Sequence, residues 1–196
     1  MPRLKGFDRD EVLERAMHLF WDGGYNATSI QDLEARLGIN RTSLYREFGS
    51  KHSLFLAVLD RYRDETITIG LQALVSSPEG LEAIRKFFDF TVEALSEGGW
   101  RSCLMSNSAA ELSRHDPDTA QRTGAHMNRV EDAFLGALTR AQALGELSPG
   151  ADLHALASYL NTLQHGLGVV GKATGDPERL RRSVETVMQL LHRQIG

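Results

Sequence analysis

Apolar residues recur at helical spacing along almost the whole chain, and no segment alternates apolar and polar residues as a strand does. The candidate helices are separated by breakers such as Gly23-Gly24, Gly98-Gly99 and Pro149-Gly150. An apolar content of 41% is enough to form a core, and 196 residues suffice for one large domain or for two smaller ones. The pattern therefore predicts an all-α protein and excludes a disordered chain.

Nine helices are expected, each bounded by a turn signal. The first begins at Asp8, where Glu11 follows three residues later as in a capping box, and the second begins near Thr28 or Ser29 and is closed by Gly38. The expected helices cover about residues 8–23, 28–37, 40–48, 51–75, 79–97, 102–114, 117–145, 150–172 and 177–194.

Several classes of protein are disfavoured by simple counts. The single cysteine, Cys103, leaves no intramolecular disulfide and fits a reducing compartment, and the first eight residues contain no apolar stretch typical of a signal peptide. Residues 153–171 lack charge but carry six polar side chains, so an interface or buried helix is favoured over a membrane span. We therefore expect a cytoplasmic protein with no membrane partner.

The distribution of charge restricts any contact with nucleic acid to one end of the chain. The net charge is −4, which argues against a general binder of polyanions. Residues 1–63 nevertheless hold ten Lys or Arg against nine Asp or Glu, whereas the remainder is acidic. A DNA-binding surface would therefore be a local patch near the N-terminus.

Residues 28–48 read as a helix, a tight turn at Gly38 and a second, short helix. Leu44 and Phe48 lie four residues apart and would anchor the short helix, while Arg41 and Arg46 would face outward. Arginine is the usual bidentate reader of guanine in the major groove. This pattern is typical of a helix-turn-helix motif, although such shapes also occur in proteins that bind no DNA.

Residues 24–30 (GYNATSI) and 37–51 (LGINRTSLYREFGSK), with Phe20 before them and Leu54-Phe55 after them, resemble the N-terminal domain of the tetracycline-repressor (TetR) family. The resemblance implies a three-helix DNA-binding domain over residues 1–50 and a helical ligand-binding and dimerisation domain over residues 51–196. It also implies a homodimeric transcriptional regulator, a repressor, that binds a palindromic double-stranded DNA operator and is released by a small molecule. No cofactor is expected.

The resemblance assigns roles to individual residues. The positions that it implies for DNA contact, to phosphates or bases, are Thr28, Ser29, Arg41, Thr42, Ser43, Tyr45, Arg46 and Lys51. The sequence departs from the family pattern at Glu34, where alanine is usual, and at Glu47, where histidine is common. A carboxylate at position 47 would repel a phosphate. Thr28, Tyr45 and Lys51 have alternative roles as a cap, a packing residue and a solvated helix start.

Leucines and valines in the last two expected helices recur at alternating steps of three and four residues, which is the spacing of a helix–helix seam. The resemblance implies that these helices form a four-helix dimer interface, and the alternative is an ordinary core within one protomer. The residues are Leu153, Leu156, Leu160, Leu163, Leu167, Leu180, Val184, Val187 and Leu191.

The region between the DNA-binding and dimerisation segments, about residues 79–145, is expected to enclose an effector pocket. Aromatic, sulfur-containing and amide side chains in apolar helices are the candidates, each with core packing as its alternative. The predicted ligand-binding residues are Phe87, Phe90, Trp100, Cys103, Asn107, Met127, Gln164 and His165. Asn161 is a further candidate polar contact.

Three other hypotheses stay open at this point. A helix start beside Arg101 would favour the thiolate of Cys103, so a repressor that senses electrophiles, oxidants or a metal through this residue is one alternative. A DNA-binding architectural protein without sequence preference is another. An enzyme is disfavoured, because the chain shows no catalytic or metal-ligating motif and the match to G-x-G-x-x-G at residues 166–171 falls inside a helix.

Overall fold

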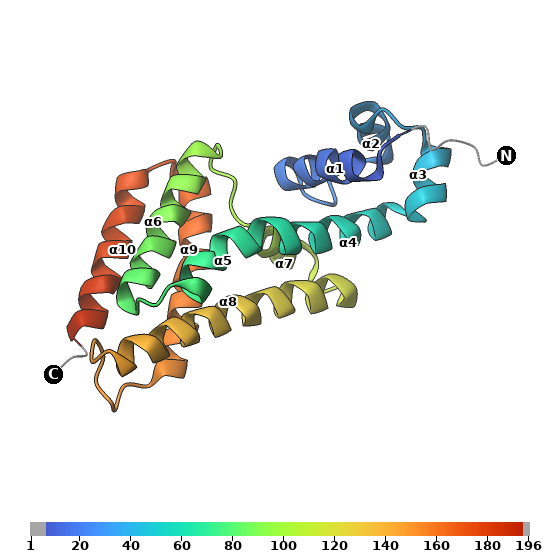
Figure 1. Cartoon of the computed structure of the whole chain (residues 1–196). Helices are drawn as coiled ribbons and strands as arrows, with labels where there is room; N and C mark the ends of the chain where they lie inside the picture. The colour runs from blue at the N-terminus through green and yellow to red at the C-terminus, as the bar shows by residue number, and fades with distance from the viewer. Residues whose placement is uncertain (1–6, 194–196) are drawn as a thin grey trace. The chain divides into compact units, whose positions relative to one another are not determined.

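The computed structural model describes residues 7–193, except for the side chains of residues 66–68. Within this range it consists of helices and contains no strand, so the predicted all-α class is confirmed (Figure 1). The helices are α1 (Arg9–Gly23), α2 (Ile30–Leu37), α3 (Arg41–Phe48), α4 (Lys51–Tyr62), α5 (Thr68–Ser76), α6 (Leu81–Glu97), α7 (Leu104–Leu112), α8 (Pro117–Ala143), α9 (Leu153–Thr174) and α10 (Pro177–His192).

The described chain forms two compact units. The first contains residues 7–65 and 104–123, that is α1 to α4, α7 and the first turns of α8. Within it α4 contacts α1, α3 and α7, and α1 also contacts α2. The largest fully buried side chains of this unit include Phe20, Leu33, Leu44 and Phe55. Their burial removes apolar area from water, and this stabilises the unit.

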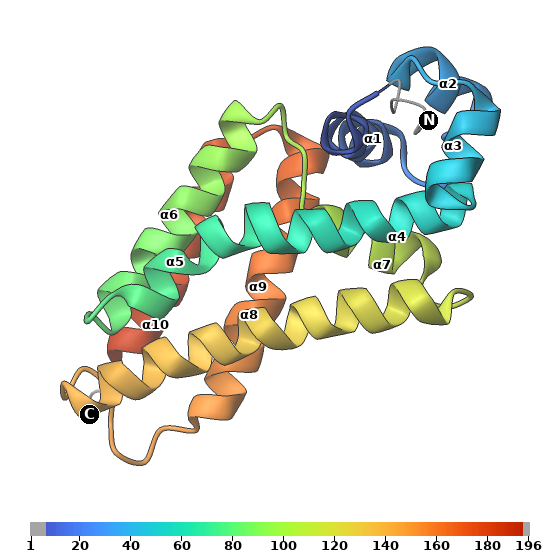
Figure 2. The ribbon, with the colours of Figure 1, turned by 45° about the vertical axis from the view of Figure 1, so that its right-hand side comes forward.

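The second unit contains residues 66–103 and 124–193. In it α6 contacts α5, α9 and α10, and the two views agree that α6 and α10 run side by side (Figures 1 and 2). Phe87, Phe88 and Phe134 form an aromatic core cluster with ring centroids 5.1–5.6 Å apart. Such edge-to-face and offset contacts add to the stabilisation that burial of the rings provides.

The ends of the N-terminal helices follow from their capping residues. Asp8 caps α1 by accepting a hydrogen bond from the N–H of Asp10, rather than through a box with Glu11. Ser29 caps α2 in a reciprocal capping box with Asp32. Gly38 ends α2 with a φ of 67°, a left-handed conformation that glycine adopts without strain.

The helix predicted over residues 51–75 is interrupted. The structure divides it into α4, a π-helical stretch (Arg63–Ile67) and α5. The guanidinium of Arg63 bonds Asp60 on one side of this stretch and Asp64 within it. Helical periodicity alone does not separate a π-helical stretch of five residues from an α-helix, because so short a stretch contains too few apolar residues to show a different spacing.

No helix in the described part of the chain has both the length and the apolar character needed to cross a lipid bilayer.

Candidate functional site

Helix α3 presents an exposed polar face on a firmly anchored rod. Leu44 and Phe48 are buried on one side, as the sequence predicted, while Arg41, Thr42 and Arg46 are exposed on the others. Within the described residues, the Arg46 guanidinium makes no ion pair. An arginine on a docked helix with no competing carboxylate can reach a base edge or a phosphate without breaking an existing contact.

The N-terminus of α3 is closed by two side chains that accept from its backbone. Asn40 Oδ1 accepts a hydrogen bond from the N–H of Ser43 at 2.8 Å. Glu34 Oε1, from α2, accepts one from the N–H of Arg41 at 2.5 Å. The acidic residue at position 34 therefore accepts from a backbone donor at the start of the next helix and links the two helices.

The second departure from the family pattern, Glu47, also has a partner. Its Oε1 lies 3.5 Å from Nε of Arg9, and the guanidinium of Arg9 lies 5.4 Å from the centre of the Phe48 ring. The charge that would repel a phosphate is thus partly neutralised by an arginine of α1. No local pattern indicates this pair, because 38 positions separate its members along the chain.

The two hydroxyl residues before α2 are engaged within the protein. Thr28 is buried, and its Oγ1 donates to the carbonyl oxygen of Gly24 at 2.7 Å. The Ser29 hydroxyl donates to Asp32 at 2.6 Å. Both side chains therefore shape the turn that leads into α2, and Ser29, not Thr28, is the cap.

The predicted phosphate contacts Tyr45 and Lys51 each lie against another side chain. The guanidinium of Arg41 is 5.2 Å from the centre of the Tyr45 ring, and Nζ of Lys51 is 4.2 Å from that of Tyr25. Burial lowers the pKa of Lys51, although the negative charge of Glu111 acts in the opposite direction. These contacts place the cations of Arg41 and Lys51 against aromatic rings at the first residues of α3 and α4.

The leucine and valine seam predicted for the dimer lies mostly inside the protomer. Six of its nine residues are buried in the second unit: Leu160, Leu167, Leu180, Val184, Val187 and Leu191. Leu153, Leu156 and Leu163 are half-buried. The six buried side chains hold the protomer together and are not available to a partner, because a core stripe and an interface stripe have the same helical spacing.

A different stripe of α9 is exposed. Its residues step by four and three along the helix and are small or apolar, except for one threonine: Ala155, Tyr159, Thr162, Gly166, Val169 and Ala173. Tyr159 and Val169 are 49% and 61% exposed. This stripe is continuous over about five turns of the helix.

The predicted effector residues do not gather at one place. Phe87 belongs to the aromatic core cluster, whereas Phe90 is 47% exposed on α6. Trp100, with a φ of 63°, packs on Gly171, where an added Cβ would lie 3.3 Å from the indole. Asn107 lies on α7 in the other unit.

A smaller set of the predicted residues does come together in the second unit. Cys103 Sγ lies 3.6 Å from Nε2 of His126 on α8, and the His126 ring centre is 6.1 Å from that of His165 on α9. Asn161, one turn before His165, donates through Nδ2 to the carbonyl oxygen of Met127 at 3.2 Å. Gln164 has its side-chain oxygen buried beside them on α9. We call His126, Asn161, Gln164 and His165 the α8–α9 polar cluster.

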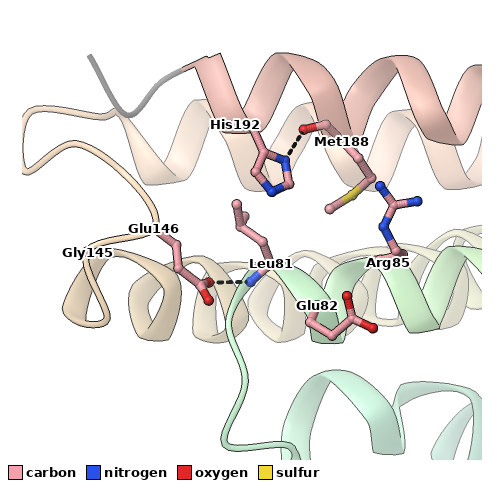
Figure 3. A pocket seen from close by; sticks show the side chains of 7 residues that line it. All are labelled: Leu81, Glu82, Arg85, Gly145, Glu146, Met188 and His192. Carbon is pink, nitrogen blue, oxygen red and sulfur yellow. Dashed lines mark hydrogen bonds between the residues drawn. The ribbon is translucent and has the colours of Figure 1, made fainter.

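The second unit also has a surface pocket of about 500 Å³ at the start of α6 and the end of α10 (Figure 3). Glu146 accepts a hydrogen bond there from the N–H of Leu81 at 2.8 Å, and His192 Nδ1 lies 2.7 Å from the Met188 carbonyl oxygen. The Arg85 guanidinium pairs with Glu185. Because these polar groups already have partners, the pocket offers a ligand few free contacts.

Comparison with known proteins relates both units to one family. Residues 12–58 match the family model described as bacterial regulatory proteins, tetR family, and residues 80–187 match the tetracyclin repressor-like C-terminal domain. An uncharacterized HTH-type transcriptional regulator of Bacillus subtilis, YezE, is 38% identical over 97% of this chain and 100% of its own length. The HTH-type transcriptional repressor ComR of Escherichia coli is 33% identical over 96% of this chain and 90% of its own.

A solved structure extends the similarity to the whole fold. A cysteine-substituted variant of the TetR family transcriptional regulator CifR, complexed with 26-base-pair double-strand operator DNA, superposes with a TM-score of 0.86. It is 29% identical in sequence, and the match covers 96% of this chain and 98% of that one.

Proposed function

Because this chain belongs to the TetR family of bacterial regulatory proteins, we propose that it is a ligand-responsive transcriptional repressor that binds a palindromic DNA operator as a homodimer. The observation that carries the proposal is the exposed face of α3, where Arg41, Thr42 and Arg46 project from a rod anchored by Leu44 and Phe48. The protein would act in the cytoplasm, where its DNA target lies, without a cofactor or an enzymatic step.

In the proposed complex α3 enters the major groove. Arg46 and Arg41 would contact base edges or phosphates, and Thr42, Ser43 and Tyr45 would bond to phosphate oxygens. Lys51 and the N-terminal turn of α2 at Thr28 and Ser29 would contact the flanking backbone. CifR, which shares the fold, forms a complex with double-strand operator DNA, and this supports DNA binding by the present chain.

The homodimer would form through α9 and α10. The exposed stripe of α9 contains Gly166, Ala155 and Ala173, and such small residues let two helices approach closely, while Tyr159 and Val169 add apolar area. A two-fold dimer presents α3 twice, and this matches a palindromic operator with half-sites about one helical turn apart.

The proposed effector would act by shifting the balance between two conformations of the protein. A small molecule releases the protein from DNA only to the extent that it binds the DNA-free conformation more tightly than the DNA-bound one. The second unit supplies the site in this proposal, and α7, which begins directly after Cys103, supplies the connection along the chain to the DNA-binding unit.

The direct test is selection of genomic DNA fragments by the purified protein, followed by competition between a selected fragment and random DNA. A regulator should prefer its operator by about a thousandfold or more at physiological salt. Equal competition by random DNA would identify a sequence-indifferent architectural protein instead.

A second candidate function, a thiol-responsive repressor, is favoured by the 3.6 Å contact between Cys103 and His126. Cys103 is half-buried and its sulfur contacts the His126 ring, so an electrophile that adds to the sulfur would disturb a contact between α8 and the segment that precedes α7. Treatment with N-ethylmaleimide should then label Cys103 and reduce operator binding, and Cys103→Ser should remain bound under the same treatment. Labelling without a change in operator affinity would remove this candidate.

A further inference from the structure

We infer that the α8–α9 polar cluster is a binding site for small molecules that donate hydrogen bonds through amide or amidine N–H groups, and that it rejects carboxylates. The inference names the chemistry of the effector and therefore rests on the proposed function. The cluster is formed by residues of the second unit alone, His126 on α8 and Asn161, Gln164 and His165 on α9.

The first step is the burial of polar atoms that lack a protein partner. His126 is 2% exposed and Asn161 is 8% exposed. His126 Nδ1, Asn161 Oδ1 and Gln164 Oε1 are all buried without a hydrogen bond. More than nine-tenths of buried polar groups in proteins are hydrogen-bonded, so three unpaired atoms within two neighbouring helices indicate a site shaped for a polar guest.

The second step is the identity of the unpaired groups. Asn161 Nδ2 donates to the Met127 carbonyl oxygen at 3.2 Å and to Glu131 Oε2 at 3.1 Å. Both partners accept only, so the amide cannot be reversed and Asn161 Oδ1 is the acceptor that points elsewhere. Asn161 Oδ1 and the neighbouring carboxylate of Glu131 are therefore acceptors for a ligand that donates hydrogen bonds.

The third step concerns charge. Burial lowers the pKa of His126 to about 4, with a smaller effect from Arg129, and burial also lowers the pKa of His165 to about 4. Both rings are therefore neutral near pH 7 and offer no positive charge to an anion. The positive charge that acts on His126 is that of Arg129, which is exposed on α8. A carboxylate entering here would lose its hydration and would face Glu131 and two acceptor oxygens, which is strongly unfavourable.

The fourth step is the presence of buried apolar residues next to the polar groups along α8 and α9. Val130, one turn after His126 on α8, and Leu160, next to Asn161 on α9, are buried. A planar donor group attached to a hydrocarbon body suits this combination of acceptors and apolar side chains. Benzamide, benzamidinium and benzoate have nearly the same shape and are neutral, cationic and anionic, so they form a matched set of probes.

The test uses full-length protein with histidine labelled with carbon-13 at Cε1 and follows the imidazole signals by NMR during titration with each probe. The signal of His126 is identified by its loss in His126→Gln. Benzamide and benzamidinium should shift the His126 and His165 signals, and benzoate should bind at least about tenfold more weakly, because it lacks the donors. Equal or tighter binding of benzoate, or no shift with any probe, would overturn the inference.

Two variants separate a binding site from a merely structural cluster. Gln164→Met removes one acceptor at similar volume and should weaken benzamide binding about fivefold or more. Glu131→Gln keeps the shape and can still accept the hydrogen bond from Asn161, but it removes a negative charge and should weaken benzamidinium binding relative to benzamide binding. Unchanged affinities in both variants would contradict the assignment.

Failure of this inference can be told from failure of the proposed function. The titrations contain no DNA, so binding of benzamide without any operator binding would leave the site intact and remove the repressor. Operator binding with no response of the cluster to any donor probe would support the repressor and remove the proposed site.

Discussion

The carboxylate of Glu111 on α7 accepts a hydrogen bond from the backbone N–H of Tyr25, in the turn between α1 and α2, at 3.0 Å. Its other oxygen accepts from the N–H of Asn26 at 2.7 Å. One side chain, 86 positions away in sequence, thus holds the turn that leads into the helix-turn-helix motif. The segment that follows Cys103 is therefore tied directly to the DNA-binding helices.

Glu111→Ala should lower the thermal stability of the first unit and weaken its binding to DNA. Two backbone donors would lose a charged acceptor, and each such hydrogen bond contributes about 1.5–3 kcal/mol. We expect a lower midpoint of thermal unfolding and weaker operator binding. The control is Glu93→Ala, which removes an exposed glutamate of α6. Equal melting temperatures for the two variants would show that Glu111 is not an anchor.

Gly24→Ala should cost more stability than Gly38→Ala. Both glycines have a positive φ, 79° and 67°. Gly38 has the left-handed α conformation, which costs alanine about 1 kcal/mol. Gly24, with a ψ of 170°, lies in a region that is open essentially to glycine alone, so its strain on substitution is larger. Only at Gly24 would the added Cβ also collide, 2.9 Å from Oε2 of Glu111, whereas nothing lies within 4 Å at Gly38. Urea unfolding of both variants measures the difference, and a larger loss at Gly38 would contradict the close contact.

Acid should destabilise the protein through His126. Its pKa is lowered by burial to about 4, below the 6.5 of an unfolded histidine, so the unfolded chain binds more protons between these values. The free energy of unfolding should therefore fall as the pH drops from about 6.5 to 4, by roughly 3 kcal/mol for this residue. His126→Gln should show a shallower fall, measured by urea unfolding at several pH values. His154→Gln, at an exposed position of α9, should behave as the wild type does.

Val169→Glu should dissociate the proposed dimer. The residue is 61% exposed in the C-terminal half of the α9 stripe, so the change adds a charge to the proposed interface without disturbing the protomer core. The dissociation constant should rise about a hundredfold, which corresponds to about 2.7 kcal/mol. Analytical ultracentrifugation measures this, with His154→Glu as the control on another face of the same helix. A wild-type protein that sediments as a monomer would refute the dimer itself.

Sequence reasoning succeeded where the determinants are local. The turn at Gly38 and the anchors Leu44 and Phe48 act within a few residues of one another, so their spacing predicts the helices that carry them. The interruption after Tyr62 carried no such local signal, because a π-helical stretch of five residues is too short to alter the apolar spacing of the surrounding helix.

The sites were less predictable because they depend on contacts between distant segments. Leu160 and Leu167 have the spacing of an interface but are buried in the protomer, and only the three-dimensional neighbours decide between the two. Asn161 and Glu131 are 30 positions apart, and Glu111 and Tyr25 are 86 apart. No pattern along the chain joins such pairs.

The central claim is that the exposed face of α3 reads an operator, and Arg46→Ala tests it most directly. The measurement is fluorescence anisotropy of a selected operator fragment at fixed salt, with Arg15→Ala on α1, whose guanidinium pairs with Glu11, as the matched control. We predict that Arg46→Ala loses about 1–3 kcal/mol of operator binding and part of its preference over random DNA, while Arg15→Ala binds as the wild type does. Unchanged affinity and preference in Arg46→Ala would contradict the account.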